Sequence, residues 1–83
     1  MEFKAFSVRD SKGDTYHLPF YKKTMGEAER EFATLTKDEK SHINQFPEDF
    51  DLYYVGGYDT DTGKFIALDT PQHMIKAASV IVR

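Results

Sequence analysis

The sequence of 83 residues contains neither cysteine nor tryptophan. Without cysteine the chain has no disulfide framework, no thiolate metal site and no thiol nucleophile, a composition that fits a reducing cytoplasm. The apolar runs fall far short of the ~20 residues that a membrane-spanning helix requires. The N-terminus also lacks the basic region and apolar core of a signal peptide. These absences predict a soluble intracellular protein without a membrane association.

The length of the chain predicts a single domain over residues 1–83, because 83 residues leave no room for a second core. A domain this small buries only roughly 60–65% of its unfolded surface, so self-association would add to its stability. The net charge is −3, but residues 1–23 sum to +2, residues 24–61 to −7 and residues 62–83 to +2. Two electrically different faces would produce this distribution, and so would ordinary scatter of few charges.

Two strands joined by a turn are predicted at the start of the chain. Aromatic and β-branched residues favour strands over residues 2–9 and 15–18. Between them, residues 10–14 are rich in Asp, Ser and Gly, and Gly13 suits a position with positive φ. Pro19 ends the second strand or confines it to a sheet edge, since proline cannot donate a ladder hydrogen bond.

A helix is predicted to begin after Thr24 and to end near residues 36–37. Thr24 and Glu27 have the spacing of a capping box, in which two side chains satisfy free N–H groups at the helix start. One apolar stripe at helical spacing follows: Met25, Ala28, Phe32 and Leu35. Residues 37–45 are polar and show no periodicity, which predicts a surface loop.

The second half of the chain predicts another hairpin. Residues 52–58 are aromatic and β-branched, as in a half-buried strand. The pair Gly56-Gly57 within this run indicates a bulge or the close approach of another backbone. An Asp-rich turn over residues 59–63 places Gly63 in a left-handed position before a fourth strand at residues 64–69.

The last segment is predicted to be a second helix over Pro71–Ile81. Thr70 would be its N-cap and Pro71 its first residue, and an apolar stripe at helical spacing follows. The β-branched residues 80–82 leave a fifth strand open as an alternative. The order ββαββα predicts an α+β domain, in which a four-stranded antiparallel sheet carries both helices on one face.

No constellation of residues indicates a catalytic, cofactor or metal site. His17, His42 and His73 each lack a second ligand at metal spacing and a neighbouring nucleophile. The turn at residues 59–63 begins like a calcium loop, but Lys64 stands where that loop needs glycine. We therefore expect a protein that is not an enzyme and that holds no cofactor and no metal.

The aromatic content is high, with seven Phe and five Tyr. Tyr53 and Tyr54 are consecutive, so on a strand they point to opposite faces and one of them lies away from the helices. Exposed rings beside the basic residues of the first hairpin suit single-stranded nucleic acid, because bases stack on rings while cations contact phosphates. Tyrosine and arginine also anchor protein interfaces, and on composition alone the negative net charge favours that interpretation.

Short motifs occur in a fixed order along the chain: Phe6-Ser7-Val8-Arg9-Asp10-x-Lys12, Tyr16-x-x-Pro19-Phe20, Ala28-x-Arg30-x-Phe32, Pro47-Glu48-Asp49-Phe50-x-Leu52-Tyr53, Gly56-x-Tyr58-Asp59, Gly63 and Pro71. In this order and spacing the chain resembles the small non-structural protein of gokushoviruses, which are Microviridae phages with single-stranded DNA genomes. The resemblance spans nearly the whole length. It departs at Phe46 and Phe50, where the family often has His and Tyr, so no role of those side chains is carried over.

The resemblance implies a viral DNA-binding protein of genome replication and packaging, in the cytoplasm of the infected bacterial host. We expect single-stranded DNA to be bound without sequence readout, by cations on phosphates and rings under bases. The candidate contact residues are Arg9, Lys12, Tyr16, Tyr21, Lys22, Lys23 and Tyr54. A small domain covers few nucleotides, so a homodimer or higher homo-oligomer is expected, with viral or host replication or packaging proteins as further partners. The alternative is an adaptor that engages a host replication enzyme or the phage procapsid.

Overall fold

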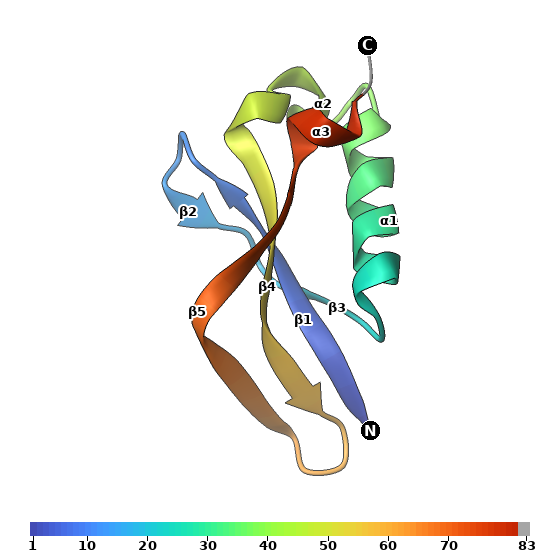
Figure 1. Ribbon diagram of the computed structural model, residues 1–83, viewed down its shortest axis with the longest axis vertical. Coiled ribbons are helices and arrows are strands. Elements are labelled where there is room, and N and C mark those ends of the chain that lie inside the picture. The colour runs from blue at the N-terminus through green and yellow to red at the C-terminus, as the bar shows by residue number, and fades with distance from the viewer. Residues whose placement is uncertain (82–83) are drawn as a thin grey trace.

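The structure, a computed structural model, describes residues 1–81 and has one antiparallel sheet with α1 packed on one face (Figure 1). The elements in chain order are β1 (Glu2–Asp10), β2 (Thr15–Tyr16), β3 (Phe20–Lys22), α1 (Met25–Lys37), α2 (His42–Gln45), η1 (Pro47–Asp49), β4 (Phe50–Asp59), β5 (Lys64–Lys76) and α3 (Ala77–Val80). The strands lie in the order β2-β1-β4-β5, and β3 pairs with the same strand as β2, namely β1. The predicted α+β class with an antiparallel sheet is confirmed.

The core lies between the sheet and α1. In the register of β1 and β4, Phe6 pairs with Tyr54 and Val8 pairs with Leu52. Because side chains alternate along a strand, these residues point to the face that the helix covers. The buried core cluster consists of Phe6, Val8, Ala28, Phe32, Ile43, Phe50, Leu52 and Ala77. Burial of each large apolar side chain contributes about 1.5–3 kcal/mol to the free energy of unfolding.

The predicted helix forms as α1 with the predicted cap. Thr24 is the N-cap, and its side-chain oxygen accepts the backbone N–H of Glu27 at 3.1 Å. Phe32 is fully buried as expected, but Leu35 is 39% exposed and Thr36 is buried in its place. Thr36 follows Phe32 by four residues, close to one helical turn, and its hydroxyl donates to the Phe32 carbonyl at 2.7 Å. A polar residue therefore completes the buried stripe.

The first hairpin differs from its prediction in two details. The strand expected over residues 15–18 is interrupted around Pro19, so β2 ends at Tyr16 and β3 resumes along β1 at Phe20. This interruption is consistent with the missing N–H of proline. In the turn, Asp14 rather than Gly13 has positive φ (53°).

The predicted surface loop at residues 37–45 contains a short helix, α2. Its N-cap Ser41 accepts the backbone N–H of Asn44 at 3.1 Å and donates its hydroxyl to the Leu35 carbonyl at 2.6 Å. Ile43 on this helix is buried in the core. One turn of helix is too short to produce a periodic pattern, and for this reason the sequence predicted only a loop.

The prediction of a helix over Pro71–Ile81 is wrong. β5 continues to Lys76, and only the four residues of α3 are helical. The register of β5 on β4 shifts between the pairs Leu52↔Ile75 and Tyr53↔His73, which leaves Met74 as an extra residue in β5. Met74 and Ile75 therefore both pack against the core. The bulge gives the apolar residues of this strand a spacing in sequence that is also typical of a helix. The alternative strand at residues 80–82 is contradicted at Val80, which lies in α3. Residue 82 lies outside the described residues.

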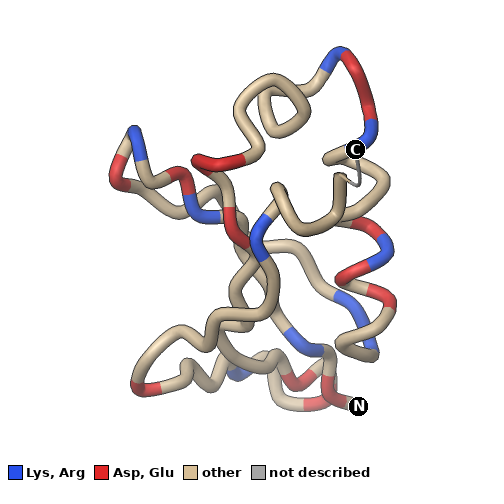
Figure 2. The backbone as a smooth tube through the Cα atoms, turned by 45° about the horizontal axis from the view of Figure 1, so that its top comes forward, with Lys and Arg blue, Asp and Glu red and all other residues tan. Residues whose placement is uncertain are grey.

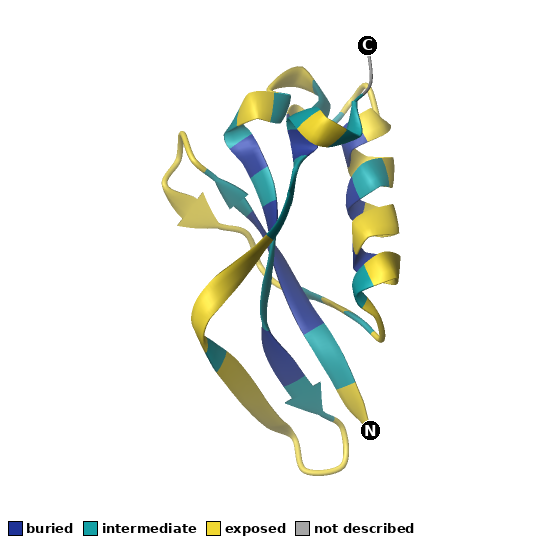
Figure 3. Cartoon of the chain, viewed as in Figure 1, coloured by how far each residue is buried: buried dark blue, intermediate teal, exposed yellow. Residues whose placement is uncertain are grey.

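Pro71 lies within an edge strand. A second irregularity of β5 falls between the pairs Tyr54↔Gln72 and Gly56↔Ala67, so residues 68–71 lie opposite the single residue Val55. At a bulge on a sheet edge proline costs no ladder hydrogen bond. The outer edge of β5 has no partner strand in the described chain, and most of its residues are exposed (Figure 3).

The hairpin turn between β4 and β5 forms as predicted, with Gly63 at φ +73°. The Asp59 carboxylate accepts the backbone N–H of Asp61 at 2.8 Å. This hydrogen bond favours the ionised carboxylate and so lowers the pKa of Asp59 below its ordinary value. The same hairpin lies at one end of an elongated molecule that measures 43 × 24 × 18 Å (Figure 1). None of the helices that the structure describes has the length and apolar character needed to cross a membrane.

The sequence predicts that Gly56-Gly57 marks either a bulge or a close approach of another backbone, and the structure shows both at this point. The register of β4 is irregular just before Gly56, and a Cβ built on Gly56 would lie 2.5 Å from the Ile66 carbonyl oxygen of β5. Such a distance is far inside van der Waals contact with a backbone atom, which cannot move without shifting the strand. Gly56 therefore fixes how closely β5 approaches β4.

We predict that Gly56→Ala lowers the free energy of unfolding by about 1–3 kcal/mol, because the methyl group forces β4 and β5 apart. Urea unfolding followed by circular dichroism measures the change. Gly26→Ala is the matched control, because nothing lies within 4 Å of a Cβ built on Gly26. Alanine in place of glycine in a helix should raise the free energy of unfolding by about 0.5–1 kcal/mol. Equal stabilities of the two variants would contradict the close approach of β4 and β5.

We also predict that Asp59→Asn is less stable than the wild type at neutral pH. Because the folded pKa of Asp59 is lowered, its contribution is present above the unfolded pKa and is lost as pH falls through the folded value. The stability difference between the two proteins should therefore disappear in acid. A difference that persists at the lowest pH would mean that the carboxylate charge is not responsible.

Candidate nucleic-acid interface

The face of the sheet opposite α1 is hereafter called the open face. Its residues are those that alternate with the core positions: Arg9 follows the buried Val8 on β1, and Tyr53 follows the buried Leu52 on β4. In the register, Arg9 pairs with Tyr16, and Tyr53 pairs with His73. Residues from β2, β1, β4 and β5 thus meet side by side across the sheet.

Three rings form a row across the open face, the aromatic row of Tyr16, Tyr53 and His73. The ring centroids of Tyr16 and Tyr53 are 5.4 Å apart, and those of Tyr53 and His73 are 5.3 Å apart, with interplanar angles of 75° and 83°. These distances and angles are those of favourable edge-to-face contacts. Tyr16 is 42% exposed and His73 is also exposed, so the row presents ring surface to solvent.

A second aromatic pair lies further along the same face. Tyr21 pairs with Ala5 and Tyr58 pairs with Phe3 in the strand registers, and the two tyrosine rings are 5.9 Å apart. The ammonium group of Lys23 lies 5.9 Å from the Phe3 ring, within cation–π range. Rings and a cation therefore occur together at this second position as well.

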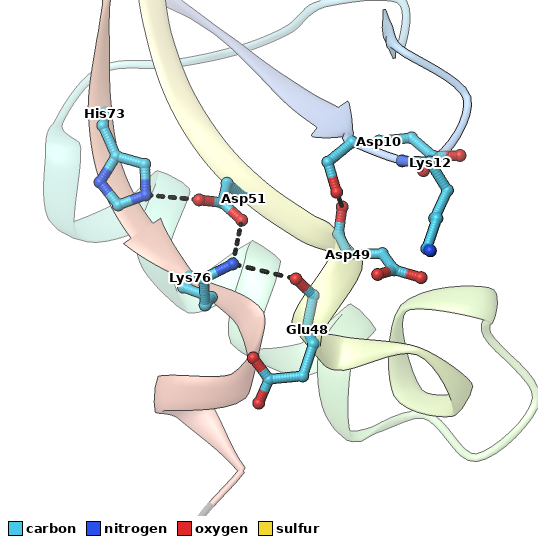
Figure 4. A network of polar contacts seen from close by, with 8 residues as sticks. Asp10, Lys12, Glu48, Asp49, Asp51, His73 and Lys76 are labelled. Carbon is cyan, nitrogen blue, oxygen red and sulfur yellow. Dashed lines mark hydrogen bonds and ion pairs between the residues drawn. The ribbon is translucent and has the colours of Figure 1, made fainter.

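Each basic side chain near the aromatic row has an acidic partner. The guanidinium of Arg9 lies 5.7 Å from the Tyr16 ring and pairs with the Asp14 carboxylate. Asp51 accepts from His73 at 2.7 Å and from the Lys76 ammonium at 3.2 Å, and Lys76 also donates to the Glu48 carbonyl at 2.9 Å (Figure 4). A phosphate that reached these cations would have to displace or share a carboxylate.

The structure divides the seven predicted contact residues into four groups, of which the last, Tyr54 alone, packs against the core. Arg9, Tyr16, Tyr21 and Lys23 lie on or beside the open face, as described above. Lys22 lies toward α1, where its ammonium pairs with the Glu31 carboxylate at 3.2 Å. Lys12 lines a separate pocket with His42 and Phe46.

The choice of Tyr54 as a stacking residue is corrected. Its ring lies 5.6 Å from the Phe6 ring and packs against the core, while Lys4 lies over it at 5.8 Å. The expectation that Tyr53 and Tyr54 point to opposite faces is confirmed, but Tyr53 is the one on the open face. The sequence contained a signal for this assignment: Leu52 is apolar and favours the buried face, so the next residue of the strand, Tyr53, points to the opposite face.

His73 and Tyr58 were missed as members of the open face. His73 was placed in a helix that does not exist, and there its partners on β4 could not be recognised. Within residues 1–81 no group of three or more His, Cys, Asp or Glu side chains is placed to hold a metal ion.

Comparison with known proteins identifies the family. The family model described as "Phage ORF5 protein" matches residues 3–80. The chain is 31% identical over 68 residues to Protein ORF5 of Chlamydia phage 1, a match that covers 77% of this chain and 71% of that protein. No solved structure matches. The chain therefore belongs to the phage ORF5 protein family of Microviridae phages, in agreement with its resemblance to the small gokushovirus protein.

Proposed function

We propose that this phage protein binds single-stranded DNA through the open face of its sheet, without sequence readout and without catalysis. The role fits viral genome replication and packaging in the cytoplasm of the infected bacterial host. The observation that carries the proposal is the aromatic row of Tyr16, Tyr53 and His73 with Arg9 beside it. Rings and cations on one sheet surface are what single-stranded nucleic acid requires.

The geometry of the aromatic row supports stacking of bases. An edge-to-face contact covers a face of only one of the two rings that make it, and Tyr16 and His73 at the two ends of the row are exposed, so ring surface stays accessible to a base. Any base can use such a face, because every base has a π surface. Single strands expose these surfaces and duplexes do not, so the row favours single-stranded DNA.

The charge distribution supports binding in which DNA phosphates replace carboxylates as the partners of individual cations, rather than attraction by a large positive field. Figure 2 shows basic and acidic residues alternating along the β1–β2 turn and along α1. The ion pair of Arg9 with Asp14 is exposed on the aspartate side, and such surface pairs contribute only about 0–1 kcal/mol. A DNA phosphate can therefore replace Asp14 as the partner of Arg9 at small cost.

Self-association is part of the proposal, because one domain covers few nucleotides and several linked domains sum weak contacts. The outer edge of β5 is suited to it: an unpaired strand edge is a template for another strand. Two large apolar side chains of this strand are exposed, Phe65 at 44% and Ile66 at 61%. A second copy that paired with this edge would cover them and extend the open face.

We predict that Arg9→Glu and Tyr53→Ala each weaken binding to a labelled single-stranded oligonucleotide in fluorescence anisotropy. Loss of one stacking ring should cost about 1–3 kcal/mol of binding free energy. For the wild type, log affinity should fall with log salt at a slope of about −0.7 per phosphate contact, and Arg9→Glu should reduce that slope.

Two variants serve as matched controls. Arg30→Glu makes the same charge change on the exposed side of α1, and Tyr54→Phe alters the neighbouring tyrosine on the core side. Both should bind like the wild type. If Arg9→Glu and Arg30→Glu weaken binding equally, the open face is not the site. If the wild type does not bind DNA at low salt, the alternative of a protein adaptor takes its place.

We predict that the protein forms a dimer or larger oligomer in light scattering and that Ile66→Lys shifts it toward the monomer. The charged side chain would be placed in the apolar contact between paired β5 edges, where its desolvation is unfavourable. Lys37→Glu, at the exposed end of α1, should leave the mass unchanged. A wild-type monomer at high concentration would remove self-association from the proposal.

A further inference from the structure

A pocket of about 370 Å³ opens where the β1–β2 turn meets α2 and η1, on the side of the sheet opposite the open face. Its lining residues are Asp10, Lys12, His42, Phe46, Asp49 and Phe50. The volume lies in the range of small-molecule sites, which are mostly apolar with a few polar groups. The rings of Phe46 and Phe50 and the imidazole of His42 supply flat apolar walls, and three charged groups supply the polar atoms.

The walls of this pocket are held in place by hydrogen bonds. Ser11 donates its backbone N–H and its hydroxyl to the Asp49 carbonyl, at 2.9 and 3.1 Å, which ties the β1–β2 turn to η1. The Asp10 carboxylate accepts the backbone N–H groups of Lys12 and Gly13 at 3.0 and 3.2 Å. The pocket is therefore preformed, and a ligand need not order it.

The charges of the pocket select the kind of group that enters. Two carboxylates, Asp10 and Asp49, face one ammonium group, Lys12, which extends from the turn toward Asp49 (Figure 4). A phosphate inside the pocket would meet like charge on two sides. A planar neutral group that donates hydrogen bonds would instead match both the rings and the carboxylates.

The pocket lies next to the open face along the backbone. Arg9 and Asp10 are consecutive on β1, so Arg9 points to the open face while Asp10 points into the pocket. A DNA strand that contacts Arg9 with a phosphate would pass the end of β1. Its next base would then be in a position to turn into the pocket, with Lys12 available for the following phosphate.

We propose that this pocket holds one unstacked nucleobase of the bound strand, with the ring against Phe46 and an exocyclic amino group donating to the Asp49 carboxylate. The inference rests on the proposed function and adds a modest base preference to it. Cytosine has an N4 amino donor, which aspartate and glutamate side chains accept in protein–DNA complexes. Thymine has a carbonyl acceptor at that place. Bases with an amino group are therefore favoured over thymine.

The test compares oligo(dC) with oligo(dT), two pyrimidine strands of equal length, in anisotropy at one salt concentration. Oligo(dC) should bind about tenfold more tightly to the wild type, the discrimination expected of one good base contact. Phe46→Ala and Asp49→Ala should each abolish this ratio, while binding of oligo(dT) changes little. Phe46 is 54% exposed, so its replacement leaves the core intact. Leu18→Ala is the matched control, since Leu18 is 91% exposed and does not line the pocket.

A second measurement separates the pocket from the open face. Deoxycytidine and thymidine, which carry no phosphate, are titrated into isotope-labelled protein and followed by NMR shifts of residues around Phe46. Shifts with deoxycytidine that Phe46→Ala removes support the pocket, even if long strands do not bind. Equal affinity for oligo(dC) and oligo(dT), together with no nucleoside shifts, overturns the pocket proposal and leaves the proposed function standing. If neither oligo(dC) nor oligo(dT) binds, the proposed function is overturned, and with it the placement of a base from a bound strand. Shifts with deoxycytidine that Phe46→Ala removes would then still assign the pocket to a free nucleobase.

Discussion

The antiparallel pairing of β1 with β4 is the constraint on which both faces of the protein depend. The pairs Phe6↔Tyr54 and Ser7↔Tyr53 decide which tyrosine is packed in the core and which is presented to solvent. A slip of one residue in this register would exchange the two faces completely. Strong apolar burial on one side of β1 therefore also fixes the arrangement of polar and aromatic groups on the other.

The residues of β1 illustrate how tightly this arrangement is packed. Ala5 and Ser7 lie on the open face by alternation, yet both are buried like Phe6. Ala5 pairs with Tyr21 and Ser7 pairs with Tyr53 on the neighbouring strands, and the Ser7 hydroxyl donates to the His17 carbonyl at 2.6 Å. Small residues at these positions allow the tyrosines of the adjacent strands to lie across β1. The open face is thus a packed layer rather than a set of independent side chains.

Local chemistry predicted the elements whose signals are local. The cap at Thr24, the left-handed Gly63 and the close approach at Gly56 each follow from one residue type in one position, and each is present. The C-terminal segment could not be predicted in this way. Its apolar residues satisfy a helical period, but the bulge at Met74 lets a strand bury the same residues, and only pairing with β4 decides between the two.

The candidate site shows the same division. Arg9 and Tyr16 could be identified because a short hairpin brings them together. His73 could not, because it reaches the aromatic row only through pairing between β4 and β5. Lys22 is basic and next to an aromatic residue, but its ion pair with Glu31 depends on where α1 packs. Residue type alone therefore overestimated the number of cations available to a polyanion.

The pairing of β1 with β4 also has a consequence for how the chain emerges from the ribosome. The first strand of the protein, residues 2–10, finds its central partner only in residues 50–59. Until that segment has been synthesised, Phe6 and Val8 have neither β4 nor the complete core to pack against. Contacts between such distant segments form slowly, because a long loop must close before they are made. During that interval the nascent chain exposes the apolar strand that later becomes the centre of the sheet.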